Sequence, residues 1–166
     1  MQIHDDHMYH GAALIQIAEH PQFTAINSLK IGGAVVPVAY KINDEISLYL
    51  KYASNPTPAY KEYPFTFTHE HLSQLAKIKA ENSKTFVALV CVKDREICCI
   101  SYDQLQSLIA RRKAEKGDDE DQYVILVTAP ERKGLRAYIN APGRKKTMLG
   151  KPLIVARNAF PGVVFG

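Results

Sequence analysis

The stretch Thr85-Phe-Val-Ala-Leu-Val-Cys-Val92 decides the fold of this 166-residue chain. Its side chains are almost wholly apolar and do not alternate with polar ones, which is typical of a strand covered on both faces. The polar stretch Lys93–Glu96 then predicts a turn into a second apolar strand, Ile97–Ile100. We therefore expect Thr85–Val92 to lie at the centre of a sheet.

Helices are predicted before and after this strand. Ser101 and Gln104 have the spacing of a capping box, and the apolar residues that follow recur at helical intervals. Upstream, Thr68 can cap a helix with an apolar stripe. Near the N-terminus, Asp6 is a plausible cap for a largely buried first helix that ends before Pro21. The central strand is thus expected to have helical neighbours.

Three further strands are predicted between the first and second helices, at Thr24–Ile31, Ala34–Ile42 and Ile46–Tyr52. The period of two in the third places Lys51 beside Tyr49, on the face opposite its aliphatic residues.

The proline-rich stretch Ala53–Pro64 predicts a loop, because proline supplies no amide for a strand ladder. After it, Phe65 and Phe67 alternate as a short strand, and Gln122–Thr128 is expected to form a hairpin with Leu135–Asn140. The pattern predicts a single α/β (α+β) domain over residues 1–166, with a central mixed β-sheet flanked by about three helices. A basic, irregular segment at 141–166 would complete it.

Composition favours a cytosolic protein that is not embedded in a membrane. The sequence has no apolar run of about 18 residues and no secretory signal at its start. Its three cysteines lie in apolar, strand-like stretches, so they are expected to be reduced core thiols. If the turn is at Asp94-Arg95, Cys91 would face Cys98, and a redox pair is the alternative.

Positive charge is concentrated near the C-terminus. Eight basic residues and one acidic residue lie between Pro130 and Arg157, so this part carries all the excess of a chain whose net charge is +4. Such a cluster, including Arg144, Lys145 and Lys146, can neutralise phosphates of DNA or RNA. A solvated loop is the alternative.

The common nucleotide-binding, zinc-protease and serine-hydrolase motifs are absent: the sequence has no GxxxxGK[ST], GxGxxG, CxxC, HExxH or GxSxG. The order of elements from Tyr9 to Arg111 instead resembles the PD-(D/E)XK nuclease superfamily. The stretches that carry the resemblance are Asn43-Asp-Glu-Ile-Ser-Leu-Tyr-Leu-Lys51 and Phe86–Ser101. Members of that family end the catalytic strand in (D/E)-x-K and continue with a strand, a tight turn, a strand and a helix.

The resemblance implies a restriction-endonuclease-like fold in which two acids hold Mg²⁺ and the lysine, here Lys51, positions or activates water. The residue two before Lys51 is Tyr49 instead of an acid, so the motif is degenerate. The resulting hypothesis is a nucleic-acid-associated domain without hydrolytic activity. The alternative is a Mg²⁺-dependent nuclease whose acids have migrated to Asp44, Glu45 or Glu19.

Aromatic side chains around Lys51 add to the nucleic-acid hypothesis. Tyr49 and Tyr52, with Tyr60 and Tyr63 further on, could stack on bases while cations hold phosphates. A different hypothesis is a noncatalytic interaction module that buries Tyr49 and the Ala53–Pro64 loop against a partner or in a homodimer.

Histidines offer a last alternative. His4, His7 and His10 recur every three residues, and the latter two could share a metal ion.

Overall fold

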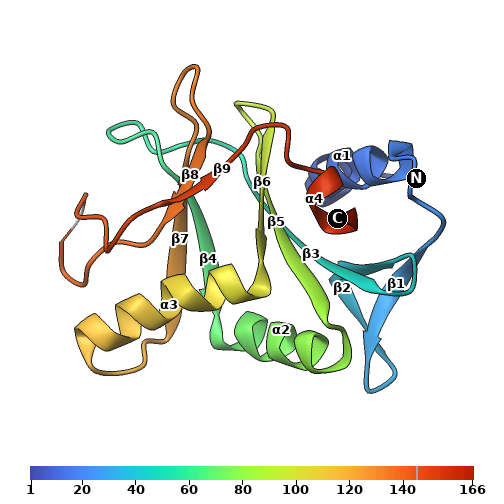
Figure 1. The fold of residues 1–166 in the computed structure, drawn as a ribbon, viewed down its shortest axis with the longest axis horizontal. Helices are drawn as coiled ribbons and strands as arrows, with labels where there is room; N and C mark the ends of the chain where they lie inside the picture. The colour runs from blue at the N-terminus through green and yellow to red at the C-terminus, as the bar shows by residue number, and fades with distance from the viewer. Residues whose placement is uncertain (145) are drawn as a thin grey trace.

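The computed structural model describes residues 1–144 and 146–166, and its strands form two sheets (Figure 1). The first sheet has the order β1-β2-β3-β5-β6 and the second β4-β7-β8-β9. The first sheet consists of β1 (Ile26–Ile31), β2 (Ala34–Ile42), β3 (Ile46–Ala53), β5 (Lys84–Cys91) and β6 (Glu96–Ser101). The second consists of β4 (Tyr63–Thr68), β7 (Gln122–Thr128), β8 (Leu135–Tyr138) and β9 (Leu153–Val155). The described helices are α1 (Asp5–Glu19), α2 (His69–Glu81), α3 (Tyr102–Lys116) and α4 (Gly162–Phe165).

The first sheet is mixed, as predicted. Strands β3 and β5 are parallel, with Leu50 opposite Ala88, and the other neighbours in this sheet are antiparallel. A parallel pair requires a crossover connection, which here contains β4 and α2. The expected α+β class with a central mixed sheet and flanking helices is confirmed.

The central strands β3 and β5 of the first sheet are buried on both faces, which explains why β5 lacks polar alternation. One face, with Tyr49, Val87 and Leu89, belongs to a core shared with the second sheet, α2 and α3. The other face, with Leu48 and Ala88, belongs to a separate core with α1 and α4. Figure 1 shows α1 and α4 together at the upper right, whereas α2 and α3 run along the bottom of the molecule, at the lower ends of the strands.

The first helix differs from the prediction in its cap and in its burial. It begins at Asp5 with His4 as the N-cap, so Asp6 is not the cap. Its buried residues are His10, Ala13 and Ile17, whereas Ile15 is 62% exposed. The prediction of a largely buried helix was wrong, because α1 covers the sheet with a single narrow stripe.

The register of the β5–β6 hairpin differs from the one that the alternative of a cysteine redox pair required. The turn occupies residues 92–95, with a hydrogen bond from the Arg95 N–H to the Val92 carbonyl, which places Cys91 opposite Glu96. Cys98 faces Leu89 instead. All three cysteines are buried free thiols, as expected of core residues. The hairpin does not place Cys91 and Cys98 directly opposite each other.

The second sheet forms around the predicted hairpin of β7 and β8, to which β4 and β9 add antiparallel edges. The C-terminal segment is less irregular than expected, because α4 follows β9. Arg157 anchors it by donating to the Pro130 carbonyl and to Glu96, the latter at 3.2 Å. Lys145 lies outside the described residues.

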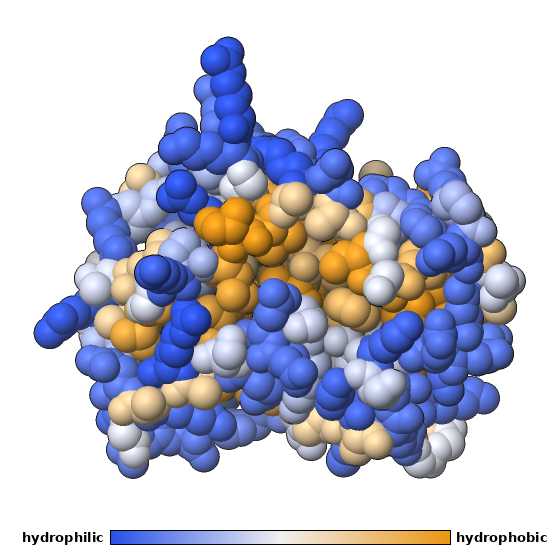
Figure 2. Space-filling view, viewed as in Figure 1, coloured by the Kyte–Doolittle hydropathy of each residue, from blue (hydrophilic) through white to orange (hydrophobic). Residues whose placement is uncertain are grey.

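The face shown in Figure 2 is mostly hydrophilic, with apolar side chains gathered near its middle. Within the described residues, no helix is long and apolar enough to span a bilayer.

Candidate functional site

Lys51 lies near the end of β3, in a cleft of about 450 Å³. The alternation of β3 directs Lys51 to the same face as Tyr49, as predicted. The edge strand β4 contributes Pro64 and Thr66 to the cleft, and α1 and α2 each contribute a histidine. With Val38 of β2, the cleft is built from five elements that meet only in the folded chain.

A histidine at the start of α2 contacts the lysine. Nζ of Lys51 lies 3.1 Å from Nδ1 of His71 and 4.9 Å from the ring centroid of Phe67. The same Nδ1 accepts from the Thr68 N–H, while the His71 N–H is bound by the Thr68 hydroxyl. Because Nδ1 accepts from a backbone amide, it is the unprotonated ring nitrogen, and the Lys51 ammonium donates to it.

Burial adjusts the acidity of the basic groups in the cleft. It lowers the pKa of Lys51 to about 8. Burial also lowers the pKa of His71, and the nearby charge of Lys51 lowers it further. The pKa of His10 is lowered chiefly by burial, against the opposing effect of Asp6. Neutral imidazoles are thereby favoured beside one cationic lysine.

His10 has an unsatisfied polar atom. The residue is 8% exposed, lines the Lys51 cleft, and has no hydrogen-bond partner for Nε2 among the described residues. A buried donor or acceptor without a partner is costly, and such groups often mark a place where water or a ligand binds. The sequence pattern did not single out this histidine for the Lys51 site.

The structure does not bring the predicted acids to Lys51. Asp44 and Glu45 precede β3, roughly 20 Å away along a strand that rises about 3.3 Å per residue. Glu45 instead lies 3.9 Å from Lys84, and Glu19 is exposed at the last position of α1.

The described residues do not form a metal-binding group either. Within residues 1–144 and 146–166, no group of three or more His, Cys, Asp or Glu side chains could hold a metal ion. His7 interacts with His4, at 5.2 Å between ring centroids, whereas His10 packs against Tyr52. The hypothesis of a shared histidine metal site is therefore not supported by this geometry.

Two of the four tyrosines predicted to stack, Tyr49 and Tyr52, differ in exposure. Tyr49 is 1% exposed and its hydroxyl donates to Gln74, so it is a core residue and presents no ring to a base. Burial raises its pKa to about 12. Tyr52 is 36% exposed, and its ring lies 4.9 Å from that of Tyr9. Tyr52 alone of the pair is accessible for stacking.

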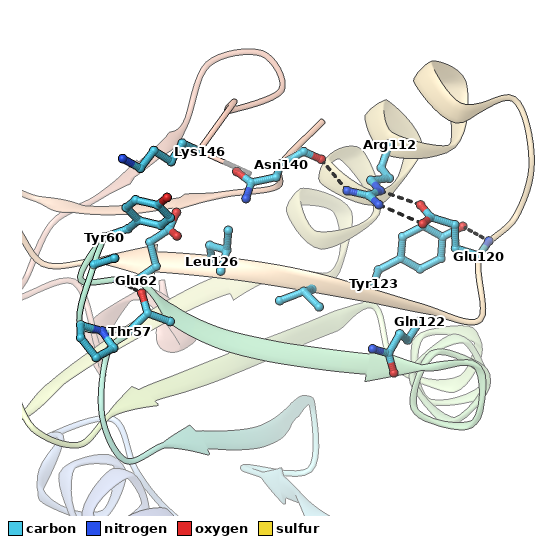
Figure 3. Close-up of a pocket in the computed structure, with 13 residues that line it drawn as sticks. Thr57, Tyr60, Glu62, Arg112, Glu120, Gln122, Tyr123, Leu126, Asn140 and Lys146 are labelled. Carbon is cyan, nitrogen blue, oxygen red and sulfur yellow. Dashed lines mark hydrogen bonds and ion pairs between the residues drawn. The ribbon is translucent and has the colours of Figure 1, made fainter. Parts of the chain in front are cut away.

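A second cavity, of about 480 Å³, lies over the outer face of the second sheet (Figure 3). Val124 and Leu126 of β7 line it. At one end Nζ of Lys146 lies 4.1 Å from the ring centroid of Tyr60. Arg112 lines the other end and holds Glu120 through two hydrogen bonds, at 2.6 and 2.9 Å.

Two polar groups inside this cavity are deeply placed. Glu62 is 6% exposed, and one of its carboxylate oxygens accepts from the Tyr138 hydroxyl. The side-chain oxygen of Asn140 is buried without a hydrogen-bond partner among the described residues. Figure 3 shows Asn140 reaching toward Leu126 from the segment above the sheet, while the Arg112 side chain donates to its backbone carbonyl.

The two cavities border the same strand pair. Pro64 and Thr66 line the Lys51 cleft, and their antiparallel partners Leu126 and Val124 line the second cavity. Partners in an antiparallel pair point to the same side of a sheet, and adjacent strands lie about 4.8 Å apart. The cavities therefore adjoin the same strand pair, one beside the edge strand β4 and the other over the outer face of β7.

Comparisons with protein-family models, with curated proteins and with solved structures gave no match. The function of the chain must therefore be argued from its own residues.

Proposed function

We propose that this chain is a nucleic-acid-binding domain with a degenerate PD-(D/E)XK nuclease-like fold, in which Lys51 holds a backbone phosphate without hydrolysing it. The observation that carries the proposal is the position of the Lys51 ammonium in an open cleft, hydrogen-bonded to a neutral imidazole. A cation whose only hydrogen-bond partner is a neutral group is not neutralised within the protein, so its charge is available to an anionic ligand.

Electrostatics support an anionic ligand. No salt bridge to Lys51 is present in the described part of the chain. Burial disfavours the charged form of Lys51. An anion that enters the cleft therefore supplies the ammonium with a favourable charge–charge interaction that the protein itself does not provide. The unpartnered Nε2 of His10 offers that anion a second polar contact.

The order of elements supports the proposed family. A helix precedes an antiparallel β1-β2-β3 meander, and a helix-containing crossover leads to the parallel strand β5. The absence of hydrolysis is proposed because Tyr49 occupies the acid position and Asp44 and Glu45 lie toward the other end of β3. The migrated-acid nuclease is accordingly not favoured.

Two cations of the C-terminal segment, one of which lines the second cavity, extend the proposed contact surface. Arg144 and Lys146 are exposed in the C-terminal segment, and Lys146 lies over the Tyr60 ring. A groove that combines cations with accessible aromatic rings is suited to single-stranded nucleic acid, because phosphates pair with the cations while bases stack on the rings. We therefore propose a single strand as the preferred ligand.

Fluorescence anisotropy with labelled single-stranded DNA and RNA, titrated at several salt concentrations, tests the proposal. Lys51→Ala is expected to weaken binding to all sequences and to reduce the slope of log affinity against log salt by about 1, or slightly less for a single strand. Lys30→Ala is the matched control, because Lys30 is an exposed lysine on β1.

The proposal is wrong if the wild-type chain binds neither polymer at low ionic strength. It is also wrong if the two alanine variants lose affinity equally, since the cleft would then contribute no more than any surface lysine. Cleavage of the oligonucleotide in the presence of Mg²⁺ would overturn the non-hydrolytic part of the proposal while leaving the binding part intact.

A further inference from the structure

We infer that the cavity between Tyr60 and Arg112 is a base-recognition pocket that accepts guanine from the bound strand. This inference rests on the proposed function and adds a base preference to it. The cavity volume of about 480 Å³ is within the roughly 300–1,000 Å³ that is usual for small-molecule sites. Its wall, floor and polar groups each match one feature of a nucleobase.

The wall and floor suit a flat ring. Tyr60 is 38% exposed and already holds a cation over its ring, and Val124 and Leu126 supply apolar surface between the two ends. A base that takes the place of Lys146 over the Tyr60 ring leaves that lysine free to pair with the phosphate of the same nucleotide. Stacking and charge neutralisation are thus supplied by adjacent residues.

Two polar side chains of the pocket, Glu62 and Asn140, present acceptor oxygens that have no partner among the described residues. The Glu62 carboxylate uses one oxygen for the Tyr138 hydroxyl, and the other has no partner among the residues that the structure describes. The Asn140 side-chain oxygen is likewise buried and unpartnered there. Glu62 is fixed by its surroundings, because its backbone N–H donates to the Thr57 hydroxyl and its carbonyl accepts from the Thr57 amide.

Two acceptors in one pocket select a base by its donors. The Watson–Crick edge of guanine presents N1–H and the N2 amine side by side. Adenine and cytosine place an acceptor beside their amine, and uracil and thymine flank one N–H with two carbonyls. Guanine is therefore the base that can satisfy both Glu62 and Asn140 without meeting an opposed acceptor. A buried acceptor facing another acceptor is disfavoured, which provides the discrimination.

The neighbouring Lys51 cleft lets one nucleic-acid strand contact both cavities. Thr66 and Val124 face each other across β4 and β7 and line different cavities. When a phosphate of the nucleic acid contacts Lys51 beside β4, the base pocket over β7 is therefore within reach of a nearby nucleotide. Phosphate contacts set position, whereas base contacts set sequence, so substitutions in the two cavities should have different effects.

Oligodeoxythymidines carrying one central guanine, hypoxanthine, adenine or cytosine test the inference with the wild-type protein alone. The guanine oligonucleotide is expected to bind about tenfold more tightly than the hypoxanthine one, which lacks the N2 amine. Its advantage over the adenine and cytosine oligonucleotides is expected to be about tenfold or more. Equal affinity for all four, with normal salt dependence, overturns the base pocket and leaves the proposed function standing. Absence of binding to every oligonucleotide overturns both.

A charge-neutralising variant assigns the preference to its residue. Glu62→Gln keeps an oxygen that can accept from Tyr138, and it is expected to bring guanine and hypoxanthine to within about twofold while leaving the salt slope unchanged. Glu115→Gln, at an exposed position of α3, makes the same chemical change away from the cavity and should retain the preference. If both variants lose the guanine preference, or if both retain it, the role of Glu62 is contradicted.

Discussion

Nζ of Lys51 and Nδ1 of His71 lie 3.1 Å apart, joining the third strand of the first sheet to the first turn of α2. The His71 imidazole accepts from the Thr68 N–H, and the Thr68 hydroxyl accepts from the backbone N–H of His71, so the amine is positioned by a fixed acceptor. This arrangement orients a cation without neutralising it, which distinguishes it from a surface ion pair.

Binding of nucleic acid should weaken as the pH rises through the Lys51 pKa of about 8. Because burial lowers this pKa from its ordinary value, the free protein carries a neutral amine at a pH where most lysines are still charged. An anionic ligand binds the ammonium form, so affinity should fall by up to about tenfold per pH unit above that point. Anisotropy titrations across this range measure the effect.

Lys51→Arg separates this titration from general changes in the protein. Arginine stays charged at every practical pH, so the variant should lose the decline above about pH 8 even if its geometry lowers affinity. A decline that persists unchanged in Lys51→Arg would show that another group causes it.

The fold could be predicted further than the site. Alternation along β3 correctly placed Lys51 on the Tyr49 face, because the period of two is local. It could not reveal that the second sheet covers Tyr49, since β4 and β7 pair between residues such as Phe65 and Ile125, sixty positions apart. Tyr49 was therefore assigned to stacking when it is a core residue.

The histidines of the cleft were missed for the same reason. His10 comes from α1 and His71 from α2, and sequence spacing does not reveal that both approach β3. The available signal was the position of His71 three residues after Thr68, where a capping box needs an acceptor side chain. Glu62 and Asn140 carried no signal, because a single polar residue becomes notable only when the fold buries it.

Reversing the charge of the C-terminal cations should weaken binding. The double variant Arg144→Glu/Lys146→Glu is expected to lose about 10- to 100-fold in affinity at low salt and to reduce the salt slope by about 2. Lys30→Glu/Lys77→Glu changes net charge equally at two exposed positions outside both cavities. If the control pair loses as much affinity as the test pair, overall charge and not the C-terminal surface governs binding.

The thiols should be unreactive in the native protein. Cys91 and Cys98 are fully buried and Cys99 is 4% exposed, and burial raises the pKa of Cys98 to about 12. Because the thiolate is the reactive form, a thiol-specific chromogenic reagent should label none of them before unfolding and all three in denaturant. Ser54→Cys, at an exposed position, should react at once and serves as the positive control. Rapid labelling of the native wild type would contradict the buried register.

Removing the Arg112 side chain should destabilise the fold. Its guanidinium binds both oxygens of Glu120 and the Asn140 carbonyl, so it joins α3, the loop before β7 and the segment after β8. With exposed side-chain fractions of 22% and 15%, the Arg112–Glu120 pair is largely desolvated. Arg112→Ala leaves Glu120 without this partner, and we expect a loss of about 2 kcal/mol in the free energy of unfolding. Urea denaturation measures it.

The matched control for Arg112 is its neighbour on α3. Lys113 pairs with Asp119 at 3.4 Å, but both side chains are well exposed, so Lys113→Ala should cost less than about 1 kcal/mol. The hydrogen bond from Arg112 lowers the pKa of Glu120, so its contribution is present above the ordinary carboxyl pKa and is lost as the pH falls through the lowered value. The stability difference between wild type and Arg112→Ala should therefore shrink in acid, and a difference that stayed constant there would show that the ion pair is not its source.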